Sequence, residues 1–448
     1  MVGIGGKKKS GFIAAMGNFS IQYNLSSASV VLPPSIMSDI YDEPSWSTYT
    51  LKGLVFAGAM VGMCVMGYLG DLIGRKRAMI FTLSLTVLGA LGCALFPWGD
   101  DANVIYAVLS ACRFILGVGV GGIYPLSAAT ASEGAVNHES VVRDVGMAFF
   151  WQTPGAMAPY LVGLILLVSF HDTKEVTEME FRLIMGLGAV FAGIVLVSAF
   201  GFEDSEEFTS HKSRSPFHEA LEHRHYWRIL VGTAGTWFLY DVAFYGTNIF
   251  TPDIIESIFG KDDNVQLCWH SLVAQAIGIP GCLLAIYLLR PKGVYWLMLW
   301  GFVLIGVFFA AFAIVYQISP DGYPALKYAL YCLLTFSLNF GPNVATFILP
   351  AVSFPANVRG IFHGLSAACA KLGAVVGTYA FDPMEDAWGM PGLLWMQTGL
   401  CAVGVIVTYF FVERDAEREL REESENAPLV DPINQTIKYG LVSENRDA

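Results

Sequence analysis

Apolar residues in this chain occur in long runs that are separated by short polar segments. About twelve of these runs approach the roughly 20 residues that a helix needs to cross the hydrocarbon core of a bilayer. They cover approximately residues 11–37, 50–70, 78–97, 103–131, 144–169, 181–202, 227–256, 267–289, 294–316, 325–352, 360–381 and 391–412. The pattern predicts an all-α membrane protein with about twelve transmembrane helices.

Composition agrees with this prediction and excludes a soluble domain. The chain is 54% hydrophobic and 14% charged, whereas a soluble domain carries about 25% charged residues. The net charge of −12 comes largely from short loops and the tail, so it says little about partners. Basic residues do not form a stripe interleaved with aromatics, and we therefore expect no nucleic-acid partner.

Charged residues alternate between successive loops and predict an orientation. One set of loops is basic, with Lys7, Lys8, Lys9, Arg75, Lys76, Arg77, Arg143, Lys212, Arg214, Arg224, Arg290, Lys292, Arg359 and Arg414. The other set is mainly acidic, with Asp39, Asp42, Glu43, Asp100, Asp101, Asp262, Asp263, Asp321, Asp382, Glu385 and Asp386. The positive-inside rule places both termini and the central loop in the cytoplasm.

The longest internal polar stretch divides the chain into six spans and six spans. We expect an N-terminal six-helix bundle over 1–202, a cytoplasmic linker over 203–226, a C-terminal six-helix bundle over 227–412 and a cytoplasmic tail over 413–448. Two six-helix halves joined by such a linker are typical of major facilitator transporters.

Asp241 and Lys371 lie deep inside apolar runs, where ionisable side chains are costly and rarely lack a polar partner or a substrate path. Trp237, Asp241 and Tyr245 follow one another at four-residue steps, so they share one helix face. Helical rise puts Lys371 about 18 Å from Arg359, Tyr124 about 13 Å from Glu133 and Asp241 about 21 Å from Trp227, all measured from the same side of the membrane. This pattern favours a binding site near the midplane; the alternative is a structural ion pair.

The segment Gly67 to Arg77 resembles the loop signature of the major facilitator superfamily along its whole length. Gly67 and Gly74 permit a close helix approach and a tight turn. Asp71 can cap a helix or pair with a base, and Arg75 can hold an acid at a neighbouring helix end. Glu133 is the candidate partner. With Arg113, a buried base of the fourth span, these residues are assigned to the conformational cycle.

Four spans resemble the phosphate:proton symporter branch of that superfamily more specifically. The similar segments are Tyr124–Ala128 (YPLSA), Trp237–Asn248, Asn339–Phe347 and His363–Lys371. The resemblance implies that Asp241 and its flanking aromatics line a phosphate site, that Lys371 contacts the anion and that Gln152 binds substrate. Asn339 and Asn343 lie one helical turn apart, so both amides can face one cavity. The implied binding set is Tyr124, Gln152, Trp237, Asp241, Tyr245, Asn343 and Lys371.

The chain departs from the branch at four positions where the resemblance implies acids. These positions hold Ile21, Asn24, Ile123 and Val352. Asp241 is then the candidate for proton coupling, because a buried carboxylate can titrate near neutral pH. Three alternatives stay open: phosphate transport coupled through Asp241 or the substrate's own proton, an uncoupled facilitator, and a carrier of an organic anion such as a phosphate ester. A transporter-like nutrient sensor, which binds the substrate without moving it, is a further alternative of a different class.

The sequence contains no nucleophile–base spacing, metal cluster or phosphate-cradling loop, so we expect neither an enzyme nor a cofactor or metal. The eight cysteines have no C-x-x-C spacing and are interpreted as packing residues. The expected partners are a small anion, protons and the lipid bilayer, with the protein as a monomer. A plasma-membrane location is favoured over an internal membrane.

Overall fold

The computed structural model describes residues 3–31, 41–42, 44–133, 138–169, 174–201, 203–204, 224–260, 264–355 and 357–414. All regular secondary structure in these ranges is helical. The chain divides into two units, Met1–Val412 and Glu413–Ala448. The helices and the candidate site belong to the first unit.

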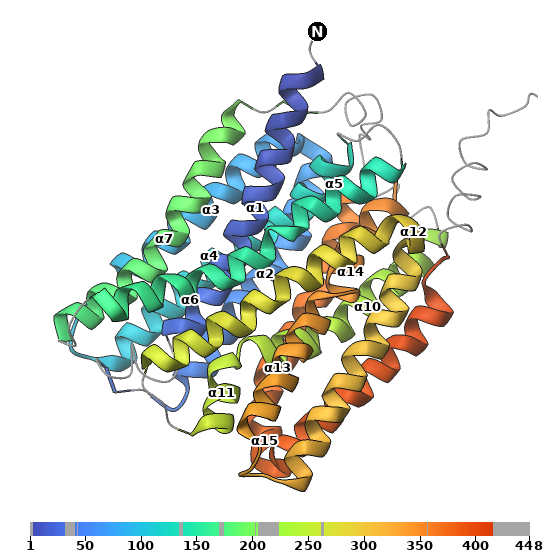
Figure 1. Ribbon diagram of the computed structural model, residues 1–448. Coiled ribbons are helices and arrows are strands. Elements are labelled where there is room, and N and C mark those ends of the chain that lie inside the picture. The colour runs from blue at the N-terminus through green and yellow to red at the C-terminus, as the bar shows by residue number, and fades with distance from the viewer. Residues whose placement is uncertain are drawn as a thin grey trace, which may run out of the picture. The chain divides into compact units, whose positions relative to one another are not determined.

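The first six spans are formed by seven helices (Figure 1). They are α1 (Gly3–Val31), α2 (Ser47–Ile73), α3 (Arg75–Leu95), α4 (Ala102–Glu133), α5 (His138–Phe150), α6 (Gln152–Ser169) and α7 (Lys174–Phe200). The last six spans are formed by α10 (Arg224–Asn248), α11 (Thr251–Phe259), α12 (Asn264–Ile318), α13 (Pro324–Asn339), α14 (Pro342–Ser353) and α15 (Arg359–Phe411).

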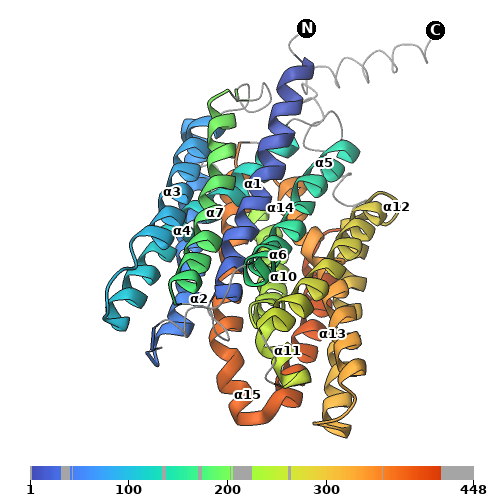
Figure 2. The same cartoon turned by 60° about the vertical axis from the view of Figure 1, so that its left-hand side comes forward.

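Two of these helices contain a reversal and each supplies two spans. Gly293 in α12 has φ 77° and Gly389 in α15 has φ 67°, both in the region that favours glycine. Figure 2 shows the hairpin that α15 forms at its lower end. The legs of α12 match the predicted spans 267–289 and 294–316 within a few residues. The first leg of α15 continues beyond the predicted span 360–381 to Gly389, and its second leg matches 391–412.

The prediction of about twelve spans is confirmed. Within the described residues, nine segments are long and apolar enough to cross a membrane, and one of them is the two-legged α12. Helices α1 and α10 complete the set, although polar residues lower their hydropathy. In α1 these include Asn18, Gln22 and Asn24, all of which are buried. The polar side chains of α1 therefore point into the protein, where most of its apolar residues are buried as well.

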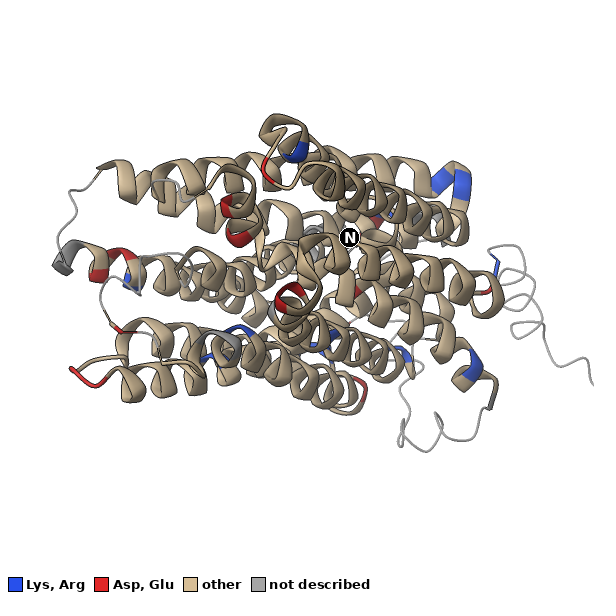
Figure 3. Ribbon diagram, turned by 90° about the horizontal axis from the view of Figure 1, so that it is seen from below, with Lys and Arg blue, Asp and Glu red and all other residues tan. Residues whose placement is uncertain are grey.

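The exterior of the helices suits a lipid environment. Charged residues are sparse along the helices in Figure 3. Large apolar side chains are instead exposed on them, among them Leu88 (62%) and Val197 (73%). An exposed apolar surface over so many helices indicates contact with lipid hydrocarbon rather than with water.

Three predicted spans are broken where the sequence analysis expected continuous helices. The breaks lie at Trp151 between α5 and α6, at Ile249–Phe250 between α10 and α11, and at Phe340–Gly341 between α13 and α14. Gly341 has φ 79°, and Pro342 then begins α14. Irregular backbone at membrane depth is tolerated where it is buried in protein or lines a cavity, and the breaks at Trp151 and Phe340–Gly341 adjoin the cavity described below.

Contacts between the first and last six spans are made mainly by α2 with α15 and by α5 and α6 with α12. Glycines allow the first of these contacts, because a Cβ on Gly67 would lie 2.5 Å from the carbonyl oxygen of Gly360. All spans group as the single compact unit Met1–Val412. The proposed boundaries at 202 and 227 stay a prediction.

Candidate functional site

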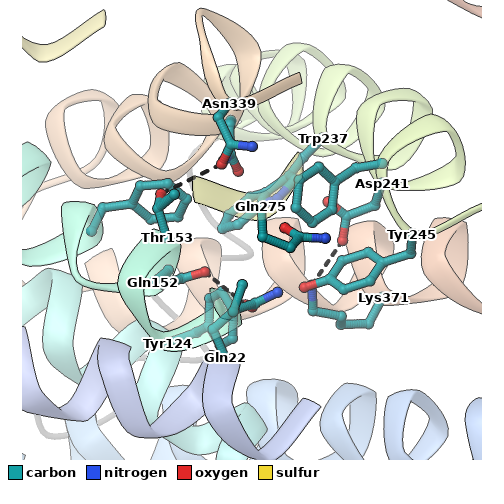
Figure 4. A pocket seen from close by; sticks show the side chains of 14 residues that line it. Gln22, Tyr124, Gln152, Thr153, Trp237, Asp241, Tyr245, Gln275, Asn339 and Lys371 are labelled. Carbon is teal, nitrogen blue, oxygen red and sulfur yellow. Dashed lines mark hydrogen bonds and ion pairs between the residues drawn. The ribbon is translucent and has the colours of Figure 1, made fainter. Parts of the chain in front are cut away.

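A buried polar cavity lies between the first and last six spans, with an empty volume of ≈ 400 Å³ (Figure 4). Its lining residues come from α1, α4, α5, α6, α10, α12, α13, α14 and α15. They are Gln22, Tyr124, Phe149, Gln152, Thr153, Ala156, Trp237, Asp241, Phe244, Tyr245, Gln275, Asn339, Asn343 and Lys371. All seven residues predicted to bind substrate are among them.

Lys371 is the centre of the charged side of this cavity. Its ammonium nitrogen donates to Asp241 Oδ2 at 2.8 Å and to Tyr245 Oη at 2.9 Å. The side chains of both charged residues are 2% exposed. The predicted four-residue spacing on α10 is what lets Asp241 and Tyr245 reach the same ammonium from one helix face.

The balance of charge in the cavity is set by this pair. Among the described lining residues, Asp241 is the only acid and Lys371 the only base. A buried ion pair is retained only when attraction and hydrogen bonds offset the loss of hydration of both ions. The Lys371 ammonium also lies 5.0 Å from the Tyr124 ring centroid, which adds a cation–π contact.

The opposite wall is a chain of neutral donors and acceptors. The Tyr124 hydroxyl donates to Gln152 Oε1 at 3.3 Å, and Gln152 Nε2 donates to Asn18 Oδ1 at 2.7 Å. Asn18 Nδ2 donates in turn to Ser127 Oγ at 3.3 Å. Hydrogen bonds therefore fix the orientation of both Tyr124 and Gln152.

The tenth span supplies two amides, but not by the expected route. Asn339 ends α13 and Asn343 lies in the first turn of α14, so the chain between them is not the single helical turn that the sequence predicted. Asn343 Nδ2 nevertheless donates to Asn339 Oδ1 at 3.2 Å, and Thr153 Oγ1 donates to the same oxygen at 3.4 Å. The break at Gly341 places Asn343 at a helix N-terminus, where backbone N–H groups lack helical acceptors.

Aromatic side chains close the cavity on the side of α10 and α14. Trp237 packs against Tyr124 at 6.4 Å, Phe347 at 6.3 Å and His363 at 5.6 Å between ring centroids. Apolar walls of this kind exclude water and strengthen the electrostatic interactions inside.

Four polar lining residues were missed as binding residues by the sequence analysis: Gln22, Thr153, Gln275 and Asn339. Gln22 is 3% exposed, and its Oε1 has no hydrogen-bond partner. Gln275 donates to Thr251 Oγ1 at 3.2 Å and accepts from Asn248 at 3.3 Å. For Gln22 and Gln275 the signal was a single amide in an apolar span, which does not indicate the face it occupies. Asn339 was expected to face a cavity with Asn343 but was left out of the binding set.

The four positions at which the resemblance implied acids are not among the described residues that line the cavity. Asn24 does not line the cavity and donates to the carbonyl oxygens of Ser20 and Gly188. Ile21, Ile123 and Val352 are buried in the hydrophobic core. A further buried carboxylate, Glu180 of α7, is 3% exposed and lies outside the described lining.

The loop signature joins the two halves at one end of the protein. Asp71 and Arg75 form a fully buried ion pair. The Asp71 carboxylate also accepts from the backbone N–H groups of Gly360 at 3.2 Å and Ile361 at 2.8 Å. Asp71 of α2 thus caps the N-terminus of α15, where a negative charge is favourable. Gly74, with φ 106°, makes the turn between α2 and α3.

Arg113 does not belong to this cluster. It is 1% exposed and donates to the carbonyl oxygens of Leu51 at 3.1 Å and Asn24 at 3.3 Å. Leu51 is near the start of α2, whereas Asp71 is near its end. The side chain of Glu133, the predicted partner of Arg75, lies outside the described residues; its neighbour Ser132 accepts from Arg359 at 3.1 Å.

Twelve membrane-crossing helices arranged around a buried polar cavity define a polytopic membrane transporter fold. The family model of the Major Facilitator Superfamily matches residues 14–378. The chain belongs to this superfamily, and its homologues are transporters rather than enzymes.

Similar proteins include "Inorganic phosphate transporter PT2" of Toxoplasma gondii (strain ATCC 50861 / VEG). The two are 36% identical over 92% of this chain and 73% of that protein. "Probable inorganic phosphate transporter 1-6" of Arabidopsis thaliana is 27% identical over 94% of each chain. Among solved structures, the proton:xylose symporter XylE bound to 6-bromo-6-deoxy-D-glucose has a TM-score of 0.77 and 14% identity. That match covers 94% of this chain and 99% of the other.

Proposed function

We propose that this protein transports inorganic phosphate across a membrane by alternating access. The observation that carries the proposal is the Lys371 ammonium, held by Asp241 and Tyr245 in a pocket lined by polar side chains. Relatives named as inorganic phosphate transporters support phosphate as the anion. In alternating access the cavity opens first to one side of the membrane and then to the other.

The groups around Lys371 suit a small oxyanion. An ammonium offers three N–H donors, of which Lys371 directs one to a carboxylate and one to a phenol. Tyr124, Gln152, Trp237 and Asn343 supply neutral donors from other helices. A tetrahedral oxyanion with several acceptor oxygens can use such donors from several directions, which distinguishes it from an apolar solute.

Two helix N-termini add to the attraction for anions. Gln152 and Thr153 begin α6, and Pro342 and Asn343 begin α14. Gln152, Thr153 and Asn343 line the cavity. Because the N-terminus of a helix carries a partial positive charge, discontinuous helices in transporters commonly direct it at anionic groups.

Asp241 is the proposed proton-linked group. When a substrate anion engages Lys371, it competes with Asp241 for the ammonium. A buried carboxylate that loses its cation is favoured in its protonated form, because burial penalises the charge. Anion binding and protonation of Asp241 then occur together, which is the linkage that a proton symporter requires.

Uptake of labelled phosphate into proteoliposomes tests this function. We expect uptake by the wild type that rises when the outside is acidified relative to the inside. Uptake that is equal with and without the pH gradient would assign an uncoupled facilitator. No phosphate uptake under either condition would reject phosphate as the substrate and direct the screen to organic anions such as phosphate esters.

The finer cellular features of this proposal rest on the sequence. Basic loops support cytoplasmic termini, and therefore a cytoplasmic position for the end that carries Asp71. We propose a monomer in the plasma membrane. Protease protection of a tagged C-terminus in sealed vesicles and light scattering of the purified protein test these assignments.

A further inference from the structure

A second buried lysine lies outside the cavity, at the end of the protein opposite Asp71. Lys52 is in the second turn of α2 and is 2% exposed. Its ammonium faces the start of α11 and lies 4.3 Å from the Phe250 ring centroid. The cavity as described does not include it.

This ammonium is poorly paired for its depth. Its ion-pair partner is Asp253 Oδ2, at 3.7 Å, which is too long for a hydrogen bond. No hydrogen bond from Lys52 is present in the described part of the chain, whereas Lys371 makes two. Buried charges normally have hydrogen-bonded partners, so the Lys52 N–H groups are available to a ligand.

Asp253 can leave Lys52 at little cost. Its side chain is 38% exposed, and it lies in the first turn of α11, where the helix dipole favours a negative charge. Its Oδ2 atom is buried and accepts no hydrogen bond, so no neighbouring donor holds the carboxylate beside Lys52. Because the rest of the side chain is exposed, the carboxylate can turn towards water when another anion binds the lysine.

Lys52 is connected to the cavity through one helical turn of α2. Phe56 follows Lys52 by four residues, or about 6 Å of helical rise on the same face. The Phe56 ring lies 4.7 Å from the Tyr245 ring, and Tyr245 binds Lys371. Two buried ammonium groups thus follow one another from the cavity towards the α11 end.

We infer that Lys52 is a second anion-binding residue, on the path between the Lys371 cavity and the α11 end of the protein. The incoming oxyanion displaces the Asp253 carboxylate from the Lys52 ammonium before it reaches Lys371, or after it leaves. The inference rests on the proposed function for the identity of the anion. It adds a second position, on the α11 side of the cavity, at which the substrate anion is bound.

The competing interpretation is that Lys52 and Asp253 only form a gate. A gate depends on the pair as a unit, so removing either partner has the same effect. If Lys52 binds the anion, loss of Lys52 and loss of Asp253 have opposite effects on substrate affinity, because Asp253 competes with the substrate for Lys52. The two interpretations therefore differ in the direction of the Asp253 effect.

Kinetics of phosphate uptake from the α11 side in proteoliposomes distinguish them. We expect Lys52→Gln to raise KM about tenfold, the usual effect of losing one charge-assisted hydrogen bond. We expect Asp253→Asn to lower KM. Lys327→Gln is the matched control, since Lys327 is also buried beside a ring, at 4.3 Å from Tyr316, but donates to the Pro320 carbonyl; its KM stays at the wild-type value.

Two results would overturn the inference. One is a change of KM in the same direction for Lys52→Gln and Asp253→Asn. The other is a wild-type KM in the charge-exchanged variant Lys52→Asp/Asp253→Lys, because an anion site cannot work with the lysine on α11 and an acid on α2.

A binding measurement separates this inference from the proposed function. If the wild type takes up no phosphate, the proposed function fails, and anion binding at Lys52 is still measured by the shift in unfolding temperature with phosphate or sulfate. Purified Lys371→Ala protein is expected to retain a weak anion-dependent shift that Lys371→Ala/Lys52→Gln loses. A shift that is absent from Lys371→Ala, or equal in both variants, rejects the Lys52 site.

Discussion

Two buried lysines of this protein differ in how their charge is compensated. Lys371 donates to a carboxylate and a phenol at 2.8 and 2.9 Å. Lys52 has one loose ion pair, at 3.7 Å, with a carboxylate whose side chain is 38% exposed. Because each ammonium is almost completely removed from water, this difference in pairing determines which lysine accepts a new partner easily. Substrate must displace strong bonds at Lys371 but only a weak one at Lys52.

Replacement of Lys371 by alanine is expected to abolish phosphate uptake, because the described lining of the cavity loses its cation. It also leaves Asp241 buried and unpaired, a change that costs about 3–5 kcal/mol of stability. The double variant Asp241→Asn/Lys371→Ala removes both charges and should recover most of the unfolding temperature without uptake. The exposed base Lys292 is the control, and Lys292→Ala should transport normally. Normal uptake by Lys371→Ala would exclude Lys371 from the site.

Asparagine at position 241 is expected to remove the effect of a pH gradient on uptake. The amide keeps the shape of the side chain and a hydrogen-bond acceptor for Lys371, but it cannot take up a proton. Initial rates at matched internal pH, with external pH varied, measure the effect, and Asp241→Glu is the variant expected to keep the dependence. A pH profile of Asp241→Asn that equals the wild-type profile would assign coupling to another group.

At the residue scale, the sequence predicted the cavity lining best where charged side chains lie inside apolar runs. Asp241 and Lys371 were costly in an apolar run, and the spacing of Trp237, Asp241 and Tyr245 fixed their common face. All seven predicted residues line the cavity; their role in binding stays a prediction. Gln22 and Gln275 were missed because a neutral amide in a membrane span costs less than a charge and gives no direction.

At the scale of elements, the sequence predicted the spans well and their interruptions poorly. Apolar length identifies a helix that crosses the bilayer, and the twelve spans follow from it. The same criterion cannot detect a break inside the run, because the residues on both sides remain apolar. The break at Phe340–Gly341 depends on close contact with α12, where a Cβ on Gly341 would lie 2.6 Å from Gly301 Cα. That contact exists only in the folded protein.

Alanine at position 341 is expected to destabilise the protein and to weaken substrate binding together. The backbone there has φ 79°, which favours glycine. Forcing an alanine into it costs about 1–3 kcal/mol, and the contact with Gly301 adds to this. Because Asn343 is positioned by this break, KM should rise as well. Gly399→Ala is the control, because nothing lies within 4 Å of the new Cβ. Its KM should equal that of the wild type, and its unfolding temperature should be at or above the wild-type value.

At the scale of the whole transporter unit, the cavity is closed by different interactions at its two ends. At one end Asp71 caps α15 and pairs with Arg75, and Gly67 packs on Gly360. At the other end Lys52 of α2 lies 4.3 Å from the Phe250 ring centroid and makes the loose ion pair with Asp253 of α11. The first closure is buried and hydrogen-bonded, and the second is weaker. We therefore expect the α11 end to open more readily from this conformation.

Asp71→Asn is expected to shift the protein towards opening at the Asp71 end. The variant loses the charge that stabilises the α15 N-terminus and the ion pair between Asp71 and Arg75. A charge at a helix N-terminus contributes about 0.3–2 kcal/mol, and a shift of 1.4 kcal/mol changes a two-state population tenfold. Spin labels at the exposed positions Ile73 and Lys292 would report a longer distance component by pulsed electron paramagnetic resonance.

The exposed pair Arg143–Asp144 provides the control for this measurement. Its side chains are 69% and 40% exposed, and surface ion pairs contribute about 0–1 kcal/mol. Asp144→Asn should therefore leave the distance distribution unchanged. If Asp71→Asn also leaves it unchanged, the buried cap does not hold this end closed. The closure would then be assigned to the glycine contacts between α2 and α15, because these are the other close contacts described between the two helices at this end.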